Sequence, residues 1–367
     1  MQLSSLDKLY LHGNSALGLP MEVLGPTYHE VRIGAAPAKP ADILEYYARI
    51  RRSSRPLNEA KLIIVGFGEV GKTSLVNRLV HDEFNPGEGK TEGINITDWS
   101  VHLREGEDIR LHIWDFGGQE ILHGTHQFFL TQRSLYILVL KGREGQEDAD
   151  AKYWLSLINS FAADSPVIVV LNKIHEQHFT LNRRELQRNF PNVRDFIETD
   201  CAEPTTGINV LDAAIRRETN HLPHLRDPFP TSWFQIKDRL AGMDEHYIAF
   251  EDYRQICRAL QETDPQAQES LAFYLHSLGI ALNYKDDPRL RDMYVLNPRW
   301  VTNGIYGIIE KLNRPGKRAE LRLSDLGDML DSTDYPRDRH VFLLELMRKF
   351  ELCFRFRESD DYTAPRL

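Results

Sequence analysis

Cysteine is scarce in this sequence of 367 residues, which holds only Cys201, Cys257 and Cys353. These residues lie far apart in the chain, whereas disulfide frameworks and zinc sites use cysteines at close, repeated spacings. We therefore expect reduced cysteines, as in proteins of the cytoplasm.

Two targeting signals are also missing from the sequence. It has no run of about 18 apolar residues, the length that a membrane-spanning helix requires. The N-terminus lacks a basic segment followed by an apolar one, which is the pattern of a secretory signal peptide. We expect no membrane span and a cytoplasmic location.

An excess of positive charge is absent as well. The chain has 45 Lys and Arg against 54 Asp and Glu, a net charge of −9, so a surface that binds nucleic acid is not expected. A composition of 41% hydrophobic and 27% charged residues is that of a folded soluble protein,. The length is sufficient for two or three domains.

The most informative stretch is a glycine-rich turn, Gly66–Thr73, which follows the apolar run 62–65. It has the pattern G-x-x-x-x-G-K-[ST] between a predicted strand and a predicted helix, which is the context of a phosphate-binding loop. Glycines allow backbone conformations that a Cβ would block, so that N–H groups can surround a phosphate. We expect Lys72 to reach the β- and γ-phosphates and the Thr73 hydroxyl to bind Mg²⁺. The predicted phosphate contacts are Gly66, Gly68, Glu69, Val70, Gly71, Lys72, Thr73 and Ser74.

Two later segments supply candidates for the metal and for the reaction. Thr91 lies in a polar loop, where it can become a second Mg²⁺ ligand when a γ-phosphate orders the loop. Asp115 ends a predicted strand and can hold the Mg²⁺ through water. Gly118 can offer its N–H to the γ-phosphate, and Gln119 can orient the attacking water. The predicted metal ligands are thus Thr73, Thr91 and Asp115, and the predicted catalytic residues are Gln119, Lys72 and Thr91.

Apolar strands alternate with helical patterns through residues 60–222, for example at 134–140 and 166–171. This alternation predicts a parallel sheet with helices on both faces, and such sheets bind ligands at the carboxyl ends of their strands. With the motifs above, the region resembles a Ras-like small GTPase domain. The resemblance implies an α/β fold with a mostly parallel six-stranded sheet that binds GTP or GDP with Mg²⁺.

The base-reading motifs of that family are altered in this sequence. Its N-K-x-D motif is replaced by N-K-I-H, which ends at His175, and its S-A-K motif by C-A-E, which ends at Glu203. A neutral imidazole offers one acceptor nitrogen, whereas an aspartate accepts two hydrogen bonds from guanine. We therefore expect weaker or less base-specific binding, with Glu176 as an alternative carboxylate. The residues expected around the base are Asn172, Lys173, His175, Cys201 and Ala202.

The first 30 residues contain one leucine-rich stretch. Leu6, Leu9, Leu11 and Asn14 follow the spacing L-x-x-L-x-L-x-x-N of a leucine-rich repeat,. One repeat cannot bury its own apolar face, so this stretch is part of a longer repeat array, a cap on the next domain, or a coincidence of leucines. Residues 31–59 are predicted to form a linker and a connecting helix capped by Asp42.

Residues 229–367 are predicted to form a second domain, after a boundary rich in proline,. Three helical patterns precede short strands, an order that resembles a winged helix. A winged helix can bind DNA, but this region carries no basic stripe. We expect protein partners for this domain and no nucleic acid.

Two further stretches, 115–129 and 294–301, resemble the Roco family, in which a Ras-of-complex (Roc) domain precedes a C-terminal-of-Roc (COR) domain. The resemblance implies a GTP-hydrolysing switch that signals to the first half of a COR domain and binds proteins through its repeat and COR surfaces. It also implies a homodimer where the second COR half, the usual dimer-forming part, is present. The alternatives are a nucleotide-binding scaffold with little hydrolysis, and a regulatory fragment of a larger Roco protein, some of which carry a kinase domain.

Overall fold

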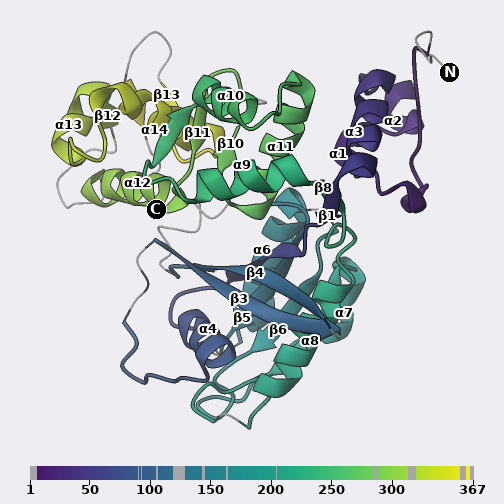
Figure 1. Cartoon of the computed structure of the whole chain (residues 1–367). Helices are drawn as coiled ribbons and strands as arrows, with labels where there is room; N and C mark the ends of the chain where they lie inside the picture. Colours follow the sequence, from purple (N-terminus) through teal and green to yellow (C-terminus); the bar gives the residue numbers. More distant parts are fainter. Residues whose placement is uncertain are drawn as a thin grey trace.

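The computed structural model of the chain describes residues 6–89, 91, 93–104, 106–118, 129–142, 145–162, 164–203, 205–284, 287–312, 320–355 and 361–363. An α/β domain of residues 59–220 lies beneath a mainly helical domain of residues 228–363, and the N-terminal helices lie beside the helical domain (Figure 1). Within the described residues, none of the helices combines the length and the hydropathy that crossing a membrane would require.

A six-stranded sheet forms the centre of the α/β domain. Its strands are β2 (Glu59–Val65), β3 (Ile94–Arg104), β4 (Glu107–Phe116), β5 (Ser134–Leu140), β6 (Val167–Leu171) and β7 (Val193–Glu198), in the order β3-β4-β2-β5-β6-β7. Strand β3 runs antiparallel to β4, and the other pairings are parallel. The expected mostly parallel sheet is confirmed, and it brings the carboxyl ends of β2, β4 and β6 to one edge.

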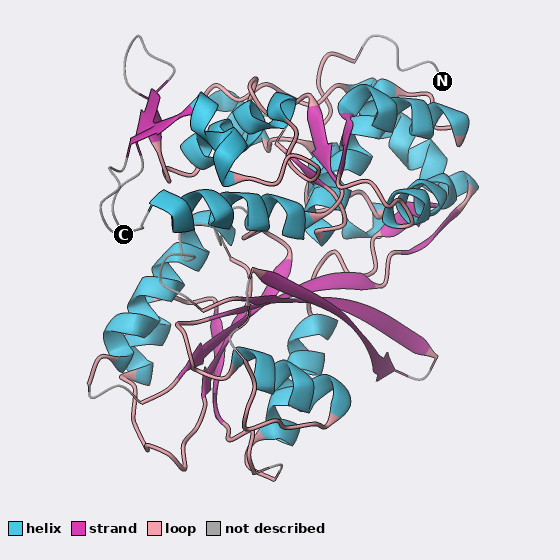
Figure 2. Ribbon diagram, turned by 90° about the vertical axis from the view of Figure 1, so that its left-hand side faces the viewer, coloured by secondary structure: helices cyan, strands magenta, loops and turns pink. Residues whose placement is uncertain are grey.

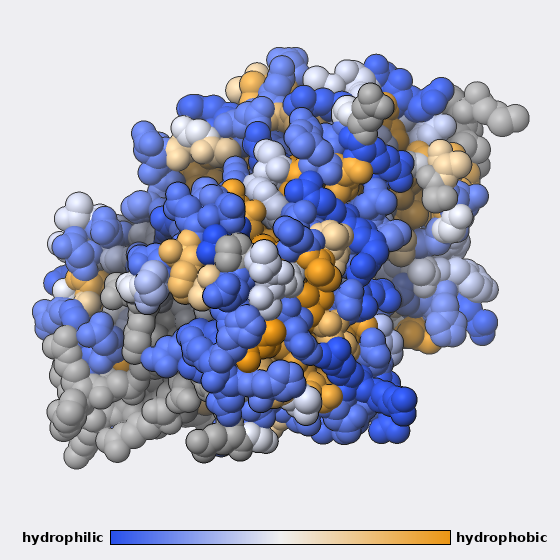
Figure 3. Space-filling model, turned by 90° about the horizontal axis from the view of Figure 1, so that it is seen from below, coloured by the Kyte–Doolittle hydropathy of each residue, from blue (hydrophilic) through white to orange (hydrophobic). Residues whose placement is uncertain are grey.

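Helices cover both faces of this sheet, as expected. They are α4 (Lys72–His81), α6 (Glu147–Ala162), α7 (Arg183–Asn189) and α8 (Ile208–Asn220). Successive strand residues point to opposite faces, so Leu62 and Ile64 pack with α4 and α8, whereas Ile63 and Val65 pack with α6 and α7. Seen from the end where α4 and α8 lie, the surface is mostly hydrophilic, with apolar residues gathered in a band across its middle (Figure 3).

The helical domain begins with three helices and three short strands. They are α9 (Thr231–Ala241), β9 (Tyr247–Ala249), α10 (Phe250–Ala259), α11 (Pro265–Leu278), β10 (Leu282–Asn283) and β11 (Met293–Val295). The strands pair antiparallel in the order β10-β11-β9, so the strand between α9 and α10 joins the two that follow α11. This is the topology of a winged helix, as predicted. Gly279, with a φ of +74°, ends α11.

Helix α11 lies against the α/β domain, so one side of this helix contacts protein. The Thr131 hydroxyl donates a hydrogen bond to the Ser277 carbonyl (3.4 Å), and a Cβ at Gly279 would overlap the Trp114 ring. In helix-turn-helix proteins the corresponding helix enters the DNA groove. Here the sheet covers one side of that helix.

The rest of the helical domain shares a core with the sheet. Its elements are α12 (Pro298–Leu312), β12 (Glu320–Arg322), η3 (Leu323–Asp325), α13 (Leu326–Met329), α14 (Arg337–Lys349), β13 (Phe354–Arg355) and β14 (Asp361–Thr363). Ile305 and Leu343 belong to the same apolar cluster as Phe116 and Trp154 of the α/β domain. Figure 2 shows the helical domain stacked above the sheet.

The N-terminal segment packs against the helical domain. It contains η1 (Ser15–Leu17), α1 (Met21–Leu24), α2 (Tyr28–Arg32), α3 (Pro40–Arg52) and β1 (Ser54–Pro56), which pairs with β8 (Pro228–Pro230). Val23 and Ile43 share a core with Trp233 and Leu271. Asn14 donates a hydrogen bond to the Leu11 carbonyl (3.0 Å), a turn contact that a leucine-rich repeat predicts; the repeat itself stays a prediction.

The predicted cap of the connecting helix was wrong. Helix α3 begins at Pro40, with Lys39 at its N-cap and no side-chain hydrogen bond to the first turn. Proline suits the first helical position because its φ is already helical and its missing N–H is not needed there. Asp42 therefore lies inside the first turn, where its negative charge interacts favourably with the positive end of the helix dipole.

Candidate functional site

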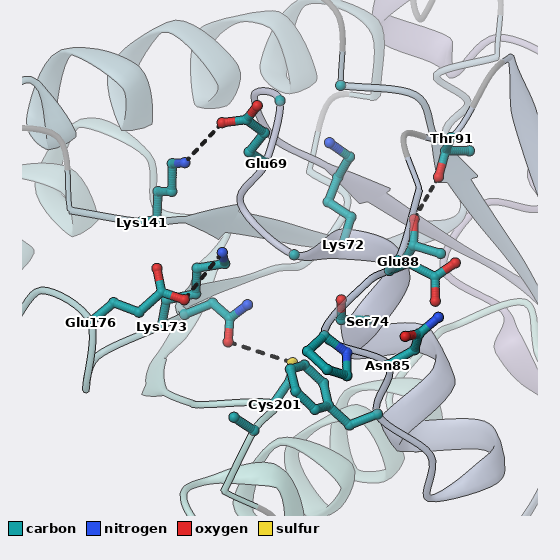
Figure 4. A pocket seen from close by; sticks show the side chains of 18 of the residues that line it. Glu69, Lys72, Ser74, Asn85, Glu88, Thr91, Lys141, Lys173, Glu176 and Cys201 are labelled. Atoms are coloured by element: carbon teal, nitrogen blue, oxygen red, sulfur yellow. Dashed lines mark hydrogen bonds and ion pairs between the residues drawn. The ribbon is translucent and has the colours of Figure 1, made fainter.

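A cavity of about 560 Å³ opens at the carboxyl edge of the sheet. The loops after β2, β4, β5, β6 and β7 line it, together with the loop that follows α4. In Figure 4, Lys72 and Thr91 lie toward one end, and Lys173, Glu176 and Cys201 lie toward the other. We refer to these as the phosphate end and the base end.

The loop Gly66–Thr73 forms the wall of the phosphate end. Gly66 has a φ of +145° and Gly71 a φ of +90°, conformations that glycine adopts without strain,. A Cβ at Gly71 would lie 2.5 Å from the Asn172 amide nitrogen. The loop then enters α4 at Lys72, so the positive end of the helix dipole faces the cavity,.

Lys72 is held within the same loop. Its side chain is buried, and its ammonium group donates to the carbonyls of Gly66 (2.8 Å) and Phe67 (2.9 Å). Gly118, just after β4, lies against it: a Cβ there would be 2.6 Å from the Lys72 Nζ. A positive charge thus lies where the predicted phosphates would enter.

Three oxygen-bearing side chains meet beside Lys72. The Thr73 hydroxyl donates to Asp115 Oδ2 (2.6 Å) and contacts the Thr91 hydroxyl (2.6 Å). Asp115 Oδ1 is buried and has no hydrogen-bond partner among the described residues. Burial raises the pKa of this carboxyl to about 6, although the Thr73 hydrogen bond and the Lys72 charge both act to lower it. Mg²⁺ prefers oxygen ligands and one or two carboxylates, so this set fits the ion, and Thr73, Thr91 and Asp115 would hold it.

Asn172 organises the base end. Its amide nitrogen donates to the Val70 carbonyl (2.8 Å), and its oxygen accepts from the Thr199 hydroxyl (3.0 Å). This buried side chain therefore ties the loops after β2, β6 and β7 together. The Lys173 side chain lies over the glycine loop, with its Cε 3.8 Å from a Cβ at Gly71, and its Nζ pairs with Glu176 (3.3 Å).

The base end differs from the sequence prediction at two positions. The His175 side chain is 57% exposed, and His175 is not among the residues that line the cavity. Asp200 lines the cavity instead, with a side chain only 8% exposed. The hydrogen bond from Thr199 to Asn172 holds the loop after β7 beside the loop after β6. Asp200 directly follows Thr199, and it therefore lies at the base end, one position before the Cys201-Ala202-Glu203 segment.

Sequence reasoning missed Asp200 and also Phe84. Phe84 is an exposed aromatic residue on the cavity wall, in the loop after α4. A lone aromatic residue in a polar loop was a usable signal for base stacking; Asp200 gave none, since which carboxylate faces the cavity depends on tertiary structure.

The other predicted site residues lie as follows. Those on the cavity wall are Gly68, Glu69, Gly71, Lys72, Thr73, Ser74, Thr91, Gly118, Asn172, Lys173, Cys201 and Ala202. Gly66, Val70 and Asp115 bond to wall residues from behind. Gln119 lies outside the described residues.

Comparison with known proteins identifies the two domains. Residues 61–175 match the family described as Ras of Complex, Roc, domain of DAPkinase, and residues 230–367 match C-terminal of Roc, COR-A domain. The solved structure of Methanosarcina barkeri Roco2 RocCORdC bound to GDP is 41% identical, with a TM-score of 0.78, over 85% of this chain and 97% of that one. The chain belongs to the Roco family. The Roc and COR domains inferred from the sequence are therefore confirmed, and the Roc domain is a GTP-binding switch domain.

Other Roco relatives are much longer. A Roc-COR-CHAT protease from an unknown prokaryotic organism is 27% identical over 99% of this Roco chain, which covers 35% of that protein. The probable serine/threonine-protein kinase pats1 of Dictyostelium discoideum is 25% identical over 99% of this chain, which covers 12% of that protein. The chain thus spans about a third or less of the length of these two relatives.

Proposed function

We propose that this chain is a magnesium-dependent switch that binds GTP, hydrolyses it slowly, and couples the state of the nucleotide to its COR domain. The observation that carries the proposal is the phosphate end of the cavity. A buried ammonium group and three oxygen ligands meet there, within a glycine loop at a helix N-terminus. That combination suits a polyphosphate with Mg²⁺. The M. barkeri Roco2 structure, which is bound to GDP, supports a guanine nucleotide.

Each residue has a distinct part in this proposal. The loop N–H groups and Lys72 hold the phosphates, and Lys72 stabilises charge that develops during transfer. Mg²⁺ on Thr73, Thr91 and Asp115 would neutralise the same oxygens. Gln119 orients the attacking water in the sequence prediction.

The rate is expected to be low because the cavity wall holds no arginine among the described residues. Arg133, in the loop before β5, pairs with Asp227 (3.3 Å) and lies over the Tyr274 ring, and it is not among the residues that line the cavity. GTPases without an arginine in place turn over at about 10⁻⁴ to 10⁻² s⁻¹.

Contacts beside Thr91 give the nucleotide a route to the COR domain. Gly93 faces α12, and a Cβ there would lie 3.0 Å from Asn303 Oδ1. On the adjoining strand, the Arg299 guanidinium donates to Asn95 Oδ1 (2.7 Å). If Thr91 bound Mg²⁺ and moved, Gly93 and Asn95 would transmit that movement to α12 through these contacts. Arg299→Ala should weaken the coupling and leave nucleotide binding intact.

Single-turnover hydrolysis tests the proposal against the scaffold alternative. With protein in excess over radiolabelled GTP, the parent should release phosphate, and Lys72→Ala should be slower by roughly 100-fold or more, since one buried cation contributes several kcal/mol. Lys152→Ala, which removes an exposed lysine of α6, is the control. Retention of GTP with no phosphate release would favour the scaffold. Equal rates in the parent and Lys72→Ala would refute the switch.

The wider partners also belong to the proposal. Protein partners on the N-terminal and COR surfaces, a homodimer in a chain with a second COR half, and a cytoplasmic location all stay predictions.

A further inference from the structure

The structure leaves one chemical requirement of the proposed function open. Guanine presents two neighbouring donors, N1–H and the N2 amino group, and these need an acceptor such as a carboxylate. At the position where N-K-x-D supplies the acceptor, this chain has His175, whose side chain is mostly exposed. A neutral imidazole has one acceptor nitrogen, and a protonated one has none.

We infer that Asp200 reads the guanine base, by accepting hydrogen bonds from N1–H and N2–H. This assignment rests on the proposed guanine-nucleotide function and names its specificity-determining residue. Asp200 comes from the loop after β7, and it takes the place of a carboxylate in the loop after β6.

The position of Asp200 is fixed by backbone groups on both sides. Its Oδ2 accepts from the His175 N–H (3.2 Å), and its Oδ1 accepts from the Ala202 N–H (3.0 Å). An ionised carboxylate has about four acceptor positions, so these two bonds leave others for a ligand. A buried, bidentate and preoriented carboxylate on the cavity wall is the group that recognition of two adjacent donors requires.

The two loops are held in this register by buried side chains. Asn172 begins the N-K-I-H segment that ends at His175, and Thr199 directly precedes Asp200; Asn172 and Thr199 share a 3.0 Å hydrogen bond. The His175 backbone therefore keeps a role: its N–H orients the carboxylate that replaces the missing one. Its side chain is 57% exposed, and the Nδ1 lies 3.7 Å from Asp200 Oδ2, so the imidazole borders the carboxylate without lining the cavity.

Glu176 is a poorer candidate for the same role. Its side chain is 68% exposed, and it pairs with Lys173 at 3.3 Å. Holding a long exposed side chain on a ligand costs conformational entropy, and an exposed ion pair gives little in return. Glu203 is exposed and is not among the cavity-lining residues.

From His175 and Glu203 alone we expected weaker or less base-specific binding. If Asp200 binds the guanine base, the selectivity for guanine is restored. Adenine presents an acceptor at the position of the guanine N1–H, so a carboxylate would repel it. The parent chain with Mg²⁺ should accordingly prefer GDP over ADP. It should also prefer GDP over IDP, which lacks the N2 amino group.

Competition binding with GDP, XDP and ADP tests the assignment. Asp200→Asn replaces an acceptor oxygen by a donor amide, which suits the C2 carbonyl of xanthine. We expect GDP affinity to fall by at least tenfold and the GDP:XDP preference to invert. Glu176→Gln makes the same change at the neighbouring carboxylate and should leave the preference within about twofold of the parent.

The outcomes separate this inference from the proposed function. If the parent binds none of these nucleotides, the proposed function fails. If the parent prefers GDP and Asp200→Asn keeps that preference, or Glu176→Gln inverts it, the assignment to Asp200 is wrong. If Asp200→Asn binds no nucleotide, the double variant Asp200→Asn, His175→Asp is measured in the same way. A recovered preference for GDP supports the exchange of carboxylates between the two loops, and no recovery overturns the assignment.

Discussion

The phosphate end and the base end of the cavity are built in different ways. One continuous loop, Gly66–Thr73, supplies most of the phosphate end, and its path is fixed by backbone conformations that glycine permits,. The base end combines side chains from the loops after β6 and β7, which meet through Asn172. A continuous loop can change little without losing its function, whereas two facing loops can exchange a carboxylate and keep the same chemistry.

The largest effect is expected at the phosphate end, from Asp115→Asn. Loss of a buried carboxylate ligand should weaken Mg-GTP binding by roughly 100-fold, since a metal contributes several kcal/mol at such a site. Without nucleotide, the same variant should melt at a higher temperature, because an unpaired buried carboxylate oxygen destabilises the fold,. Thermal melts with and without Mg-GTP measure both effects; a variant that binds Mg-GTP like the parent would remove Asp115 from the site.

Gly118→Ala should have the next largest effect. The new Cβ would lie 2.6 Å from the Lys72 Nζ and 2.6 Å from the Gly68 Cα, so the ammonium group must move. We expect roughly tenfold weaker GTP binding, about 1.4 kcal/mol. Gly87→Ala, in the loop after α4, would meet only Asn85 at 3.5 Å and is the matched control. Equal affinities of both variants for GTP would show that Lys72 does not depend on this close approach.

Asn172→Ala should damage the contact between the two ends. It removes the hydrogen bonds to Val70 and Thr199 and leaves their buried partners unsatisfied, which costs about 1–3 kcal/mol of folding stability,. Denaturant unfolding measures this loss. A change below about 0.5 kcal/mol, the range of surface substitutions, would mean that Asn172 does not tie the loops together.

The smallest effect is expected for His175→Ala. The side chain is mostly exposed, and the variant keeps the backbone N–H that Asp200 accepts. GDP affinity should stay within roughly twofold of the parent, as for other surface substitutions. A loss of tenfold or more in a GDP titration would return the base-reading role to the imidazole.

These contrasts also explain what the sequence could predict. Strong periodic patterns predicted the parallel sheet, because such patterns depend on residues close together in the chain. Two other contacts join residues far apart in the chain, so local patterns could not predict them: Gly279 packs on Trp114, and Asp200 accepts a hydrogen bond from the His175 N–H. Local signals also failed at α3, where the helix began at Pro40 and not after Asp42.

The most direct test is a crystal structure of this chain with Mg-GDP. The account predicts the β-phosphate inside the Gly66–Thr73 loop beside Lys72, Mg²⁺ near Thr73, and the guanine N1 and N2 within hydrogen-bond distance of Asp200. An empty phosphate loop would contradict the proposed switch. A bound GDP whose base lies away from Asp200 would contradict the reading of guanine proposed for this residue.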